Sequence, residues 1–376
     1  MIQIAFFAPV LITGGTQRHL QQVLTLLDRR RFGARVLTLR TGGEVAEELR
    51  AAGVPVASLD VGERLASPRA LMAMVRAARD LRAGGIDVVH GYQWRPALVG
   101  ALVGRLARVP LLMAGKRSLT GGDATARRAW RSIGRRVDTI VTNATALRVE
   151  AEHDRVSARW EIIPSGVDVG QFADLPDAAA ARVALGVDPA TPVVGTVGRL
   201  EVRKGHDTLL LAAQALARQG RRVQVLIVGD GPLREALAGR AAALGLDGMV
   251  RFTGNLRDVR PALAAMDAFV LPSEAEGMSN ALLEALAAGR AVVATAVGGT
   301  SEVCDGEQTG LLVPAGDPAA MADALARLLA DPARAARMGA AGRAAVDERF
   351  GARAMVARLE RLYEDRLAAG RRGLAA

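Results

Sequence analysis

Short apolar runs alternate with longer amphipathic stretches along the whole chain of 376 residues. Runs of about four to eight apolar residues between helical patterns are typical of buried parallel strands joined by crossover helices. The pattern predicts two groups of strands, each forming a doubly wound α/β sheet. The expected strands are IQIAFFA, ARVLTLR, PVASLD, IDVVH, PLLMAG, DTIVTN and EIIP in the first group, and PVVGTVG, VQVLIVGD, VRFTG, DAFVLP, AVVATA and GLLVP in the second.

A polar, proline-bearing and alanine-rich stretch, at about residues 168–191, separates the two groups. The pattern therefore predicts two Rossmann-like domains, residues 1–170 and 171–350. Residues 351–376 are expected to form a closing helix and tail that pack back toward the first domain, and the inward positions of this pattern are Phe350, Met355, Leu359 and Leu362. Neither a membrane span nor a signal peptide is expected, because no apolar run reaches about 18 residues and no basic segment precedes the first strand.

Parallel sheets bind ligands at the carboxyl ends of their strands, so two sheets facing each other predict a binding cleft. After the first strand, Gly14 and Gly15 open a helix whose free amides suit a phosphate, although such a turn alone is more often only a turn. After the first strand of the second group, Arg199 and Lys204 lie on a loop that leads into a helix. Two cations there suit a diphosphate, and the alternative is a solvated basic loop.

The segment EGMSNALLEALAAG, residues 276–289, follows the predicted strand DAFVLP. Ser279 or Asn280 is the expected N-cap of a helix whose first amides are free to bind a phosphate. Glu276 precedes that helix, and Glu284 leans back toward its start because helical side chains point toward the N-terminus. The two carboxylates lie at most about 12 Å apart, and they suit the hydroxyl groups of a ribose and a hexose on either side of a diphosphate. The spacing alone is uninformative, and the surrounding strand–cap–helix pattern gives it weight.

Taken together, these segments resemble the retaining, GT-B-fold glycosyltransferases that carry an E-x7-E motif. The resemblance runs nearly end to end, through GGTQRHL, IDVVHGYQW, IIPSGVDVGQF, VGRLEVRKGHDTLL, GDGPLRE, VRFTGNLRDV, PSEAEGMSNALLEALAAGRAVVATAVGGTSE and YEDRL. It implies two Rossmann-like domains facing across a cleft, with a nucleotide-diphosphate sugar held mainly by the second and a glycan or lipid-linked acceptor held mainly by the first. It also implies hexosyl transfer with retention and without a metal or other cofactor, and the sequence contains no D-x-D.

The resemblance also implies a role for individual residues. The position of Glu276 contacts the transferred sugar, and the position of Glu284 contacts the ribose. The positions of Arg199 and Lys204 bind the diphosphate and stabilise the leaving group. The remaining donor-binding positions are Gly14, Gly15, Asn255, Gly277, Met278, Ser279 and Asn280.

Two departures from the family pattern affect the expected site. Many members carry His-x-His where this chain has His90-Gly91-Tyr92. We expect His90 to position the sugar near the reacting carbon and Tyr92 to lie on the acceptor side, although a lone histidine at a strand end is as often structural. The usual Glu-Gly-Phe-Gly becomes Glu-Gly-Met-Ser, which alters the wall beside the sugar at Met278.

The net charge of +10 is concentrated in the first half. Residues 1–175 contain 25 Lys and Arg against 16 Asp and Glu, or +9, and residues 176–376 contain 24 against 23, or +1. Such an asymmetry indicates either an acidic partner for the first domain or an arginine-rich composition on a solvated surface. Lys116 and Arg117 follow a strand end, and we expect them to meet the acceptor.

A second basic segment of the first half is TARRAWRSIGRRVDTI. Trp130, Ile133 and Val137 follow helical spacing on another face from its arginines, so the segment is either a helix packed on the core or a basic surface that docks on anionic lipid. The second alternative predicts salt-sensitive binding to anionic liposomes. The arginines are Arg127, Arg128, Arg131, Arg135 and Arg136.

Two other functions are compatible with parts of this pattern. A nucleotide-sugar epimerase or hydrolase of the same fold converts the donor without any acceptor. A basic nucleic-acid-binding protein is disfavoured, because only 3% of residues are aromatic and no recognition module is present. We expect no nucleic acid partner. The single cysteine, Cys304, fits a cytoplasmic protein, with peripheral attachment to the inner face of the cell membrane as a further expectation.

Overall fold

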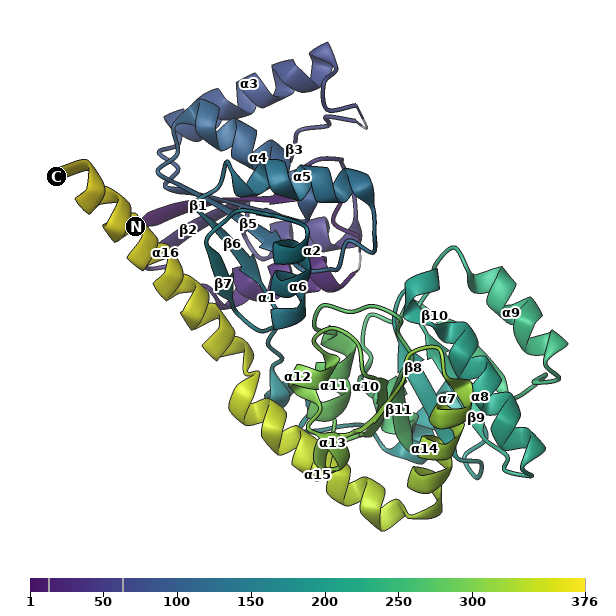
Figure 1. The fold of residues 1–376 in the computed structure, drawn as a ribbon. Helices are drawn as coiled ribbons and strands as arrows, with labels where there is room; N and C mark the ends of the chain where they lie inside the picture. Colours follow the sequence, from purple (N-terminus) through teal and green to yellow (C-terminus); the bar gives the residue numbers. More distant parts are fainter. Residues whose placement is uncertain (13, 63, 376) are drawn as a thin grey trace. The chain divides into compact units, whose positions relative to one another are not determined.

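The computed structural model describes residues 1–12, 14–62 and 64–375, with side chains described as far as residue 370. The chain divides into unit 1, made of Met1–Ser165 and Ala352–Ala376, and unit 2, Gly166–Gly351. Each unit contains one parallel sheet with flanking helices (Figure 1). The two-domain doubly wound α/β architecture predicted from the sequence is therefore confirmed.

The sheet of unit 1 has the strand order β3-β2-β1-β4-β5-β6-β7, and every pairing in it is parallel. Each strand expected in the first half is present, within a few residues of its predicted position. The strands are β1 Ile2–Ala8, β2 Phe32–Thr38, β3 Val56–Ser58, β4 Val88–Tyr92, β5 Leu111–Lys116, β6 Thr139–Thr142 and β7 Trp160–Ile162.

Helices cover this sheet on both faces. One core cluster joins α1 and α2 to the sheet through side chains such as Leu20 and Leu49, and α16 contributes to the same cluster. A second cluster joins α3 and α4 to alternate residues of the same strands, such as Phe7 and Val89. The helices are α1 Gly15–Leu26, α2 Glu44–Ala51, α3 Pro68–Ala83, α4 Trp94–Ala107, α5 Ala124–Gly134, α6 Thr145–His153 and α16 Ala352–Ala375.

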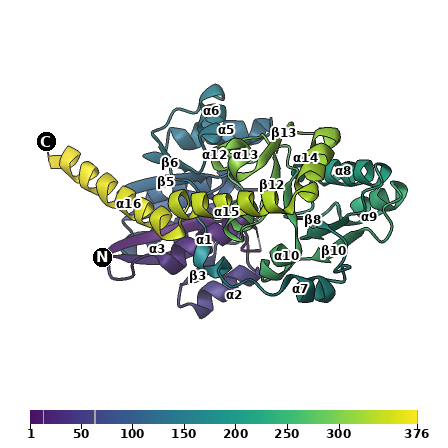
Figure 2. The same ribbon diagram turned by 90° about the horizontal axis from the view of Figure 1, so that it is seen from below.

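The C-terminal helix α16 packs on unit 1 beside α1, as Figures 1 and 2 show. Met355, Leu359 and Leu362 are buried in the core of that unit, as their spacing predicted. Phe350 is also buried, but it follows the preceding helix and lies in unit 2, because α16 begins only at Ala352. None of the described helices combines the length and the apolar character that a membrane span needs.

The sheet of unit 2 has the order β10-β9-β8-β11-β12-β13 and is also parallel throughout. All six strands expected in the second half are present. The strands are β8 Val193–Val197, β9 Gln224–Val228, β10 Val250–Gly254, β11 Ala268–Leu271, β12 Ala291–Thr295 and β13 Leu311–Val313.

A cluster of buried aliphatic side chains joins helices α8, α9 and α14 to this sheet, and α8 and α14 lie side by side (Figures 1 and 2). Unit 2 begins at Gly166, just before the stretch of residues 168–191 that was predicted to separate the two domains. The amide of Val167 joins this start to the end of the same unit, because it donates to the carbonyl oxygen of Phe350, 2.8 Å away. The helical segments are η1 Val169–Phe172, α7 Ala178–Leu185, η2 Val202–Lys204, α8 His206–Arg218, α9 Arg234–Ala243, α10 Arg260–Ala265, α11 Asn280–Ala287, α12 Thr300–Val303, α13 Gly306–Thr309, α14 Pro318–Ala330 and α15 Pro332–Arg349.

Candidate functional site

The candidate site in unit 2 is built at the carboxyl ends of β8 and β11, where parallel sheets bind ligands. Lys204 ends the short helix η2 that follows β8, and Glu276 lies in the loop that follows β11. The two side chains meet, with Lys204 Nζ 2.5 Å from Glu276 Oε1. Ser273 Oγ donates to the same carboxylate oxygen at 2.7 Å. A carboxylate that is only 7% exposed therefore has an ammonium and a hydroxyl as partners.

Two glycines let the backbone around this pair pack closely. Gly205 has φ of +63°, and a Cβ there would lie 2.0 Å from the carbonyl oxygen of Pro272. Gly298 has φ of +52°, and a Cβ there would lie 1.8 Å from the carbonyl oxygen of Glu276 itself. A larger residue at either position displaces the loop, because non-bonded carbon and oxygen atoms do not approach so closely and L-residues disfavour this φ.

Helix α11 begins directly after Glu276 and its neighbours. Ser279, one of the two predicted candidates, is the N-cap, and its Oγ accepts a hydrogen bond from the amide of Leu282 at 3.4 Å. Asn280 is the first helical residue, and Glu284 lies one turn further along, half-buried. Gly277, Met278 and Ser279 are buried at the start of the helix, so the amides that an anion could use sit beside a largely packed loop.

Arg199 follows β8, on the loop that leads to Lys204. Its side chain is 54% exposed, and its Nε lies 3.7 Å from Glu201 Oε2. Backbone hydrogen bonds join the loops after β8, β9 and β10. They run from Gly198 N to Val228 O, from Leu200 N to Asp230 O and from Gly229 N to Gly254 O. Arg199 and the exposed Asn255 therefore belong to the same edge of the sheet.

In unit 1, His90 and Tyr92 lie on one face of β4 and are both buried. His90 Nδ1 lies 2.8 Å from the hydroxyl oxygen of Tyr363 on α16, and the ring of Tyr92 stacks on His90 with the centroids 4.6 Å apart. The hydroxyl of Tyr92 lies 3.3 Å from Nε2 of His19. Burial lowers the pKa of His90 to about 3, with the Arg117 charge adding to the effect, so His90 is neutral at physiological pH.

This cluster contains unsatisfied polar atoms. His90 Nε2 and His19 Nδ1 have no hydrogen-bond partner among the described residues. Both histidines line a cavity of about 10 Å³ together with Tyr92 and Arg117, which is space for one water molecule. The resemblance pointed to His90 and Tyr92 but not to His19 or Tyr363. Tyr363 reaches His90, and His19 reaches Tyr92, because α16 and α1 pack on the same strand. The sequence alone does not reveal this packing.

The other residues expected on the acceptor side already have partners within unit 1. Lys116 is 1% exposed, and its Nζ lies 2.6 Å from Glu150 Oε2 and 2.9 Å from the Ser118 carbonyl oxygen. Arg117 donates to Ser165 Oγ at 2.8 Å, and burial lowers its pKa to about 10. Acceptor binding by either side chain stays a prediction, and for Lys116 it would compete with a buried ion pair.

Two further predicted elements can be described locally. Gly14 is the N-cap of α1 in an extended conformation, and Gly15 is the first helical residue. The basic segment of the first half forms α5, with Trp130 and Ile133 buried in the core. Its apolar face is therefore not available to a membrane, which leaves only the arginines of α5 for that role. Within the described ranges, no three His, Cys, Asp or Glu side chains are grouped so that they could hold a metal ion.

Comparisons with known proteins point to one family. Residues 191–331 match the family described as "Glycosyl transferases group 1", and residues 13–171 match "Glycosyltransferase Family 4". A D-inositol 3-phosphate glycosyltransferase from Kineococcus radiotolerans is 35% identical over 373 residues, covering 87% of this chain and 85% of the relative. The chain belongs to the group 1 glycosyltransferases.

Other proteins similar to this chain carry different names and match different shares of it. A GDP-mannose-dependent monoacylated alpha-(1-6)-phosphatidylinositol monomannoside mannosyltransferase from Corynebacterium glutamicum is 36% identical over 251 residues. That match covers 63% of this chain and 65% of the relative, just under two thirds of its length.

Among solved structures, Anabaena Alr3699/HepE in complex with UDP and glucose has a TM-score of 0.87 at 22% identity and covers 97% of this chain and 100% of that chain. Sucrose-phosphate synthase from Thermosynechococcus elongatus has a TM-score of 0.81 at 24% identity, with 98% and 100% covered. Both structures share the fold.

Proposed function

We propose that this protein transfers a hexose from a nucleotide-diphosphate sugar to a glycan or lipid-linked glycan, with retention at the anomeric carbon and without a metal. The observation that carries the proposal is the contact between Lys204 and Glu276 immediately before helix α11. A cation and a carboxylate from two separate loops are thereby brought together beside the start of a helix, which is the chemistry that a sugar diphosphate needs.

In this proposal the diphosphate lies at the N-terminus of α11, and departure of the nucleoside diphosphate builds negative charge on its β-phosphate. Lys204 and Arg199 stabilise that charge, as fixed positive groups in a preorganised site commonly do. Glu276 accepts hydrogen bonds from the hexose hydroxyls and Glu284 from the ribose hydroxyls. Lys204 has three N–H donors, so it can keep its bond to Glu276 while it donates to a phosphate oxygen.

The names of the relatives suggest which donors to test first. Several are described as GDP-mannose-dependent mannosyltransferases, and UDP complexes occur among the structural neighbours. A thermal-shift screen against GDP-, UDP- and ADP-sugars identifies the donor, because a ligand that binds only the folded state raises Tm. Incubation with the donor alone then separates transfer from the same-fold alternatives: an epimer or free sugar formed at the rate of transfer would contradict the proposal.

The role of Lys204 is tested by Lys204→Ala with Arg203→Ala as the matched control. Both residues lie in η2, but Arg203 is exposed, and among the described residues its side chain bonds only to Glu201, at 2.6 Å. We expect Lys204→Ala to lower kcat by about 10²- to 10³-fold, the usual effect of deleting one transition-state donor, and Arg203→Ala to change it little. Equal rates for folded Lys204→Ala and wild-type protein would refute the assignment.

We also propose that the protein works in the cytoplasm at the inner face of the cell membrane. A lipid-linked acceptor requires access to a bilayer surface, and the +9 charge of residues 1–175 favours an anionic one. Sedimentation with anionic liposomes at low and high salt tests this part separately from sugar transfer.

A further inference from the structure

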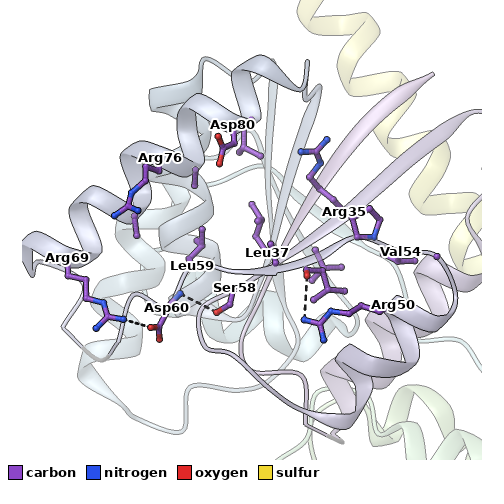
Figure 3. Close-up of a pocket in the computed structure, with 18 residues that line it drawn as sticks. Arg35, Leu37, Arg50, Val54, Ser58, Leu59, Asp60, Arg69, Arg76 and Asp80 are labelled. Carbon is purple, nitrogen blue, oxygen red and sulfur yellow. Dashed lines mark hydrogen bonds and ion pairs between the residues drawn. The ribbon is translucent and has the colours of Figure 1, made fainter.

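A cavity with a volume of about 970 Å³ lies between helix α3 and the edge strand β3 in unit 1 (Figure 3). It runs along the whole of β3, from Pro55 before the strand to Asp60 after it. Its volume is in the range of small-molecule sites. None of its lining residues belongs to the donor site of unit 2 or to the His90 cluster.

The cavity combines an apolar floor with a rim of arginines. Leu37 and Leu59 lie in its centre, and four arginines surround them: Arg69 and Arg76 from α3 on one side, Arg35 from β2 and Arg50 from α2 on the other (Figure 3). Such an arrangement suits a ligand with an apolar part and an anionic head.

Not all of these arginines are equally available. Arg69 pairs with Asp60, and Arg50 bonds to Glu47 at 2.8 Å. Arg35 and Arg76 form no hydrogen bond or ion pair with any described residue. Among the described residues of the lining, Asp80 is the one further acid, so Arg35 and Arg76 face one carboxylate there.

The position of Arg35 is unusual for a strand residue. It shares a face of β2 with Leu37, because side chains alternate along a strand, and this is the face on which α3 packs. That face normally carries apolar residues where a helix covers it. The guanidinium of this half-buried residue lies beside Gly84, at the C-terminal end of α3.

The outer surface of α3 provides an independent observation. Leu71, Met72 and Val75 are 53%, 56% and 40% exposed, whereas the outer face of a surface helix is normally polar. Met72 precedes Arg76 by four residues, so the two side chains are neighbours on the helix. Leu102 and Leu106 of α4, which packs against α3, are also exposed. α3 contains four arginines and one acidic residue.

We propose that the cavity beside α3 binds the phosphate headgroup of an anionic phospholipid, while Leu71, Met72 and Val75 enter the apolar layer of the bilayer. Arg35 and Arg76 hold the phosphate, and the apolar floor receives the glycerol and upper chain segments. The outward apolar side chains favour a lipid over a soluble phosphate, since a soluble ligand would not need them. This inference rests on the proposed membrane attachment and names α3, rather than α5, as the surface that makes it.

The test compares two double variants that remove the same charge. Arg35→Gln/Arg76→Gln changes the cavity, and Arg128→Gln/Arg135→Gln changes two exposed arginines, one in α5 and one directly after it. Helix α4 packs between α3 and α5. The arginines changed in the two variants are therefore about two interhelical distances apart, roughly 20 Å. This separation exceeds the Debye length of about 10 Å at 0.1 M salt. Full-length protein is sedimented with vesicles of phosphatidylcholine, alone or mixed with phosphatidylglycerol.

We expect the cavity variant to bind the mixed vesicles about 25-fold more weakly, at roughly fivefold for each arginine near an anionic surface. The α5 variant should lose much less. Leu71→Ser/Met72→Ser should weaken binding without changing its dependence on salt. Equal midpoints of tryptophan fluorescence in urea show that unit 1 of every variant is folded, because all three tryptophans lie there, and equal donor-induced shifts in Tm show that unit 2 is unaffected.

Three results would overturn the inference. Equal losses in the two arginine variants would show that charge acts without a specific site. Release from vesicles by millimolar inorganic phosphate, in the wild type but not in the cavity variant, would assign the cavity to a soluble anion. If wild-type protein does not sediment with anionic vesicles, membrane attachment and this inference both fail, but sugar transfer, which is assayed without vesicles, does not.

Discussion

The contact between Lys204 and Glu276 places opposite charges in a nearly buried position before any donor arrives. Burying a lone carboxylate is costly, and a direct partner removes much of that cost. Ser273 supplies a second partner through Oγ. The free protein therefore holds the Glu276 side chain in place without substrate, which is the preorganisation that electrostatic catalysis requires.

Gly298 makes this arrangement sterically possible, and replacing it should disturb Glu276. We expect Gly298→Ala to cost roughly 1–2 kcal/mol for the left-handed backbone, plus the strain of a Cβ 1.8 Å from the Glu276 carbonyl oxygen. Gly289→Ala is the matched control, because its φ is +67° and nothing lies within 4 Å of the added Cβ. Urea unfolding should show the larger loss for Gly298→Ala, and only that variant should reduce the donor-induced shift in Tm. Equal losses would mean that the loop relaxes freely.

Residue roles were predictable where a short segment contains the whole pattern. Ser279 could be identified as the N-cap because the cap, the helix and the preceding strand are contiguous. Lys116 illustrates the opposite case: its place at a strand end suggested an acceptor contact, but Glu150, which occupies its ammonium, lies 34 residues away on α6. Ser273 was inside a quoted segment, yet nothing in its spacing indicated that its hydroxyl bonds to Glu276.

At the scale of elements, the thirteen strands were predictable because buried parallel strands are almost continuously apolar. The packing of α3 was not. Its pattern contains enough apolar residues for a core helix, and only the structure shows that Leu71, Met72 and Val75 remain exposed. The converse applies to α5, where Trp130 and Ile133 are buried and Arg128 remains exposed.

Helix α16 is joined to the sheet of unit 1 by a polar contact as well as by its apolar face. Tyr363→Phe keeps the ring and removes the hydroxyl that lies 2.8 Å from His90 Nδ1. We expect the free energy of unfolding of unit 1 to fall by about 1–3 kcal/mol, the usual effect of leaving a buried polar group unpaired. Tryptophan fluorescence during urea unfolding measures it, because Trp94, Trp130 and Trp160 all lie in unit 1. An unchanged midpoint would mean that water replaces the hydroxyl.

At the scale of the whole molecule, the two units differ in their buried ionisable groups. Burial lowers the pKa of His19 to well below its usual value and that of His90 to about 3, both in unit 1. In unit 2, burial lowers the pKa of His206 to about 4, with Lys204 adding to the effect. Each histidine is therefore neutral in the folded state at pH values where the unfolded chain binds a proton.

This difference predicts unequal acid sensitivity of the two units. Between about pH 6.5 and pH 5 the unfolded state binds more protons, so stability is lost as pH falls, by roughly 1.4 kcal/mol per pH unit for each histidine. Unit 1, with two such groups, should lose about twice as much as unit 2. Carboxylates with lowered pKa, such as Glu150 and Glu307, contribute only below this window, because they titrate in the unfolded chain near pH 4.5.

The measurement uses two probes of urea unfolding at several pH values. Tryptophan fluorescence reports unit 1, since all three tryptophans lie there, and circular dichroism reports both units. The fluorescence midpoint should fall more steeply with acid than the second dichroism transition, and His206→Asn should flatten only the latter. A fluorescence midpoint that stays constant down to about pH 5 would show that His19 and His90 are protonated in the folded protein, and the water-sized cavity between them would then have to accommodate charge.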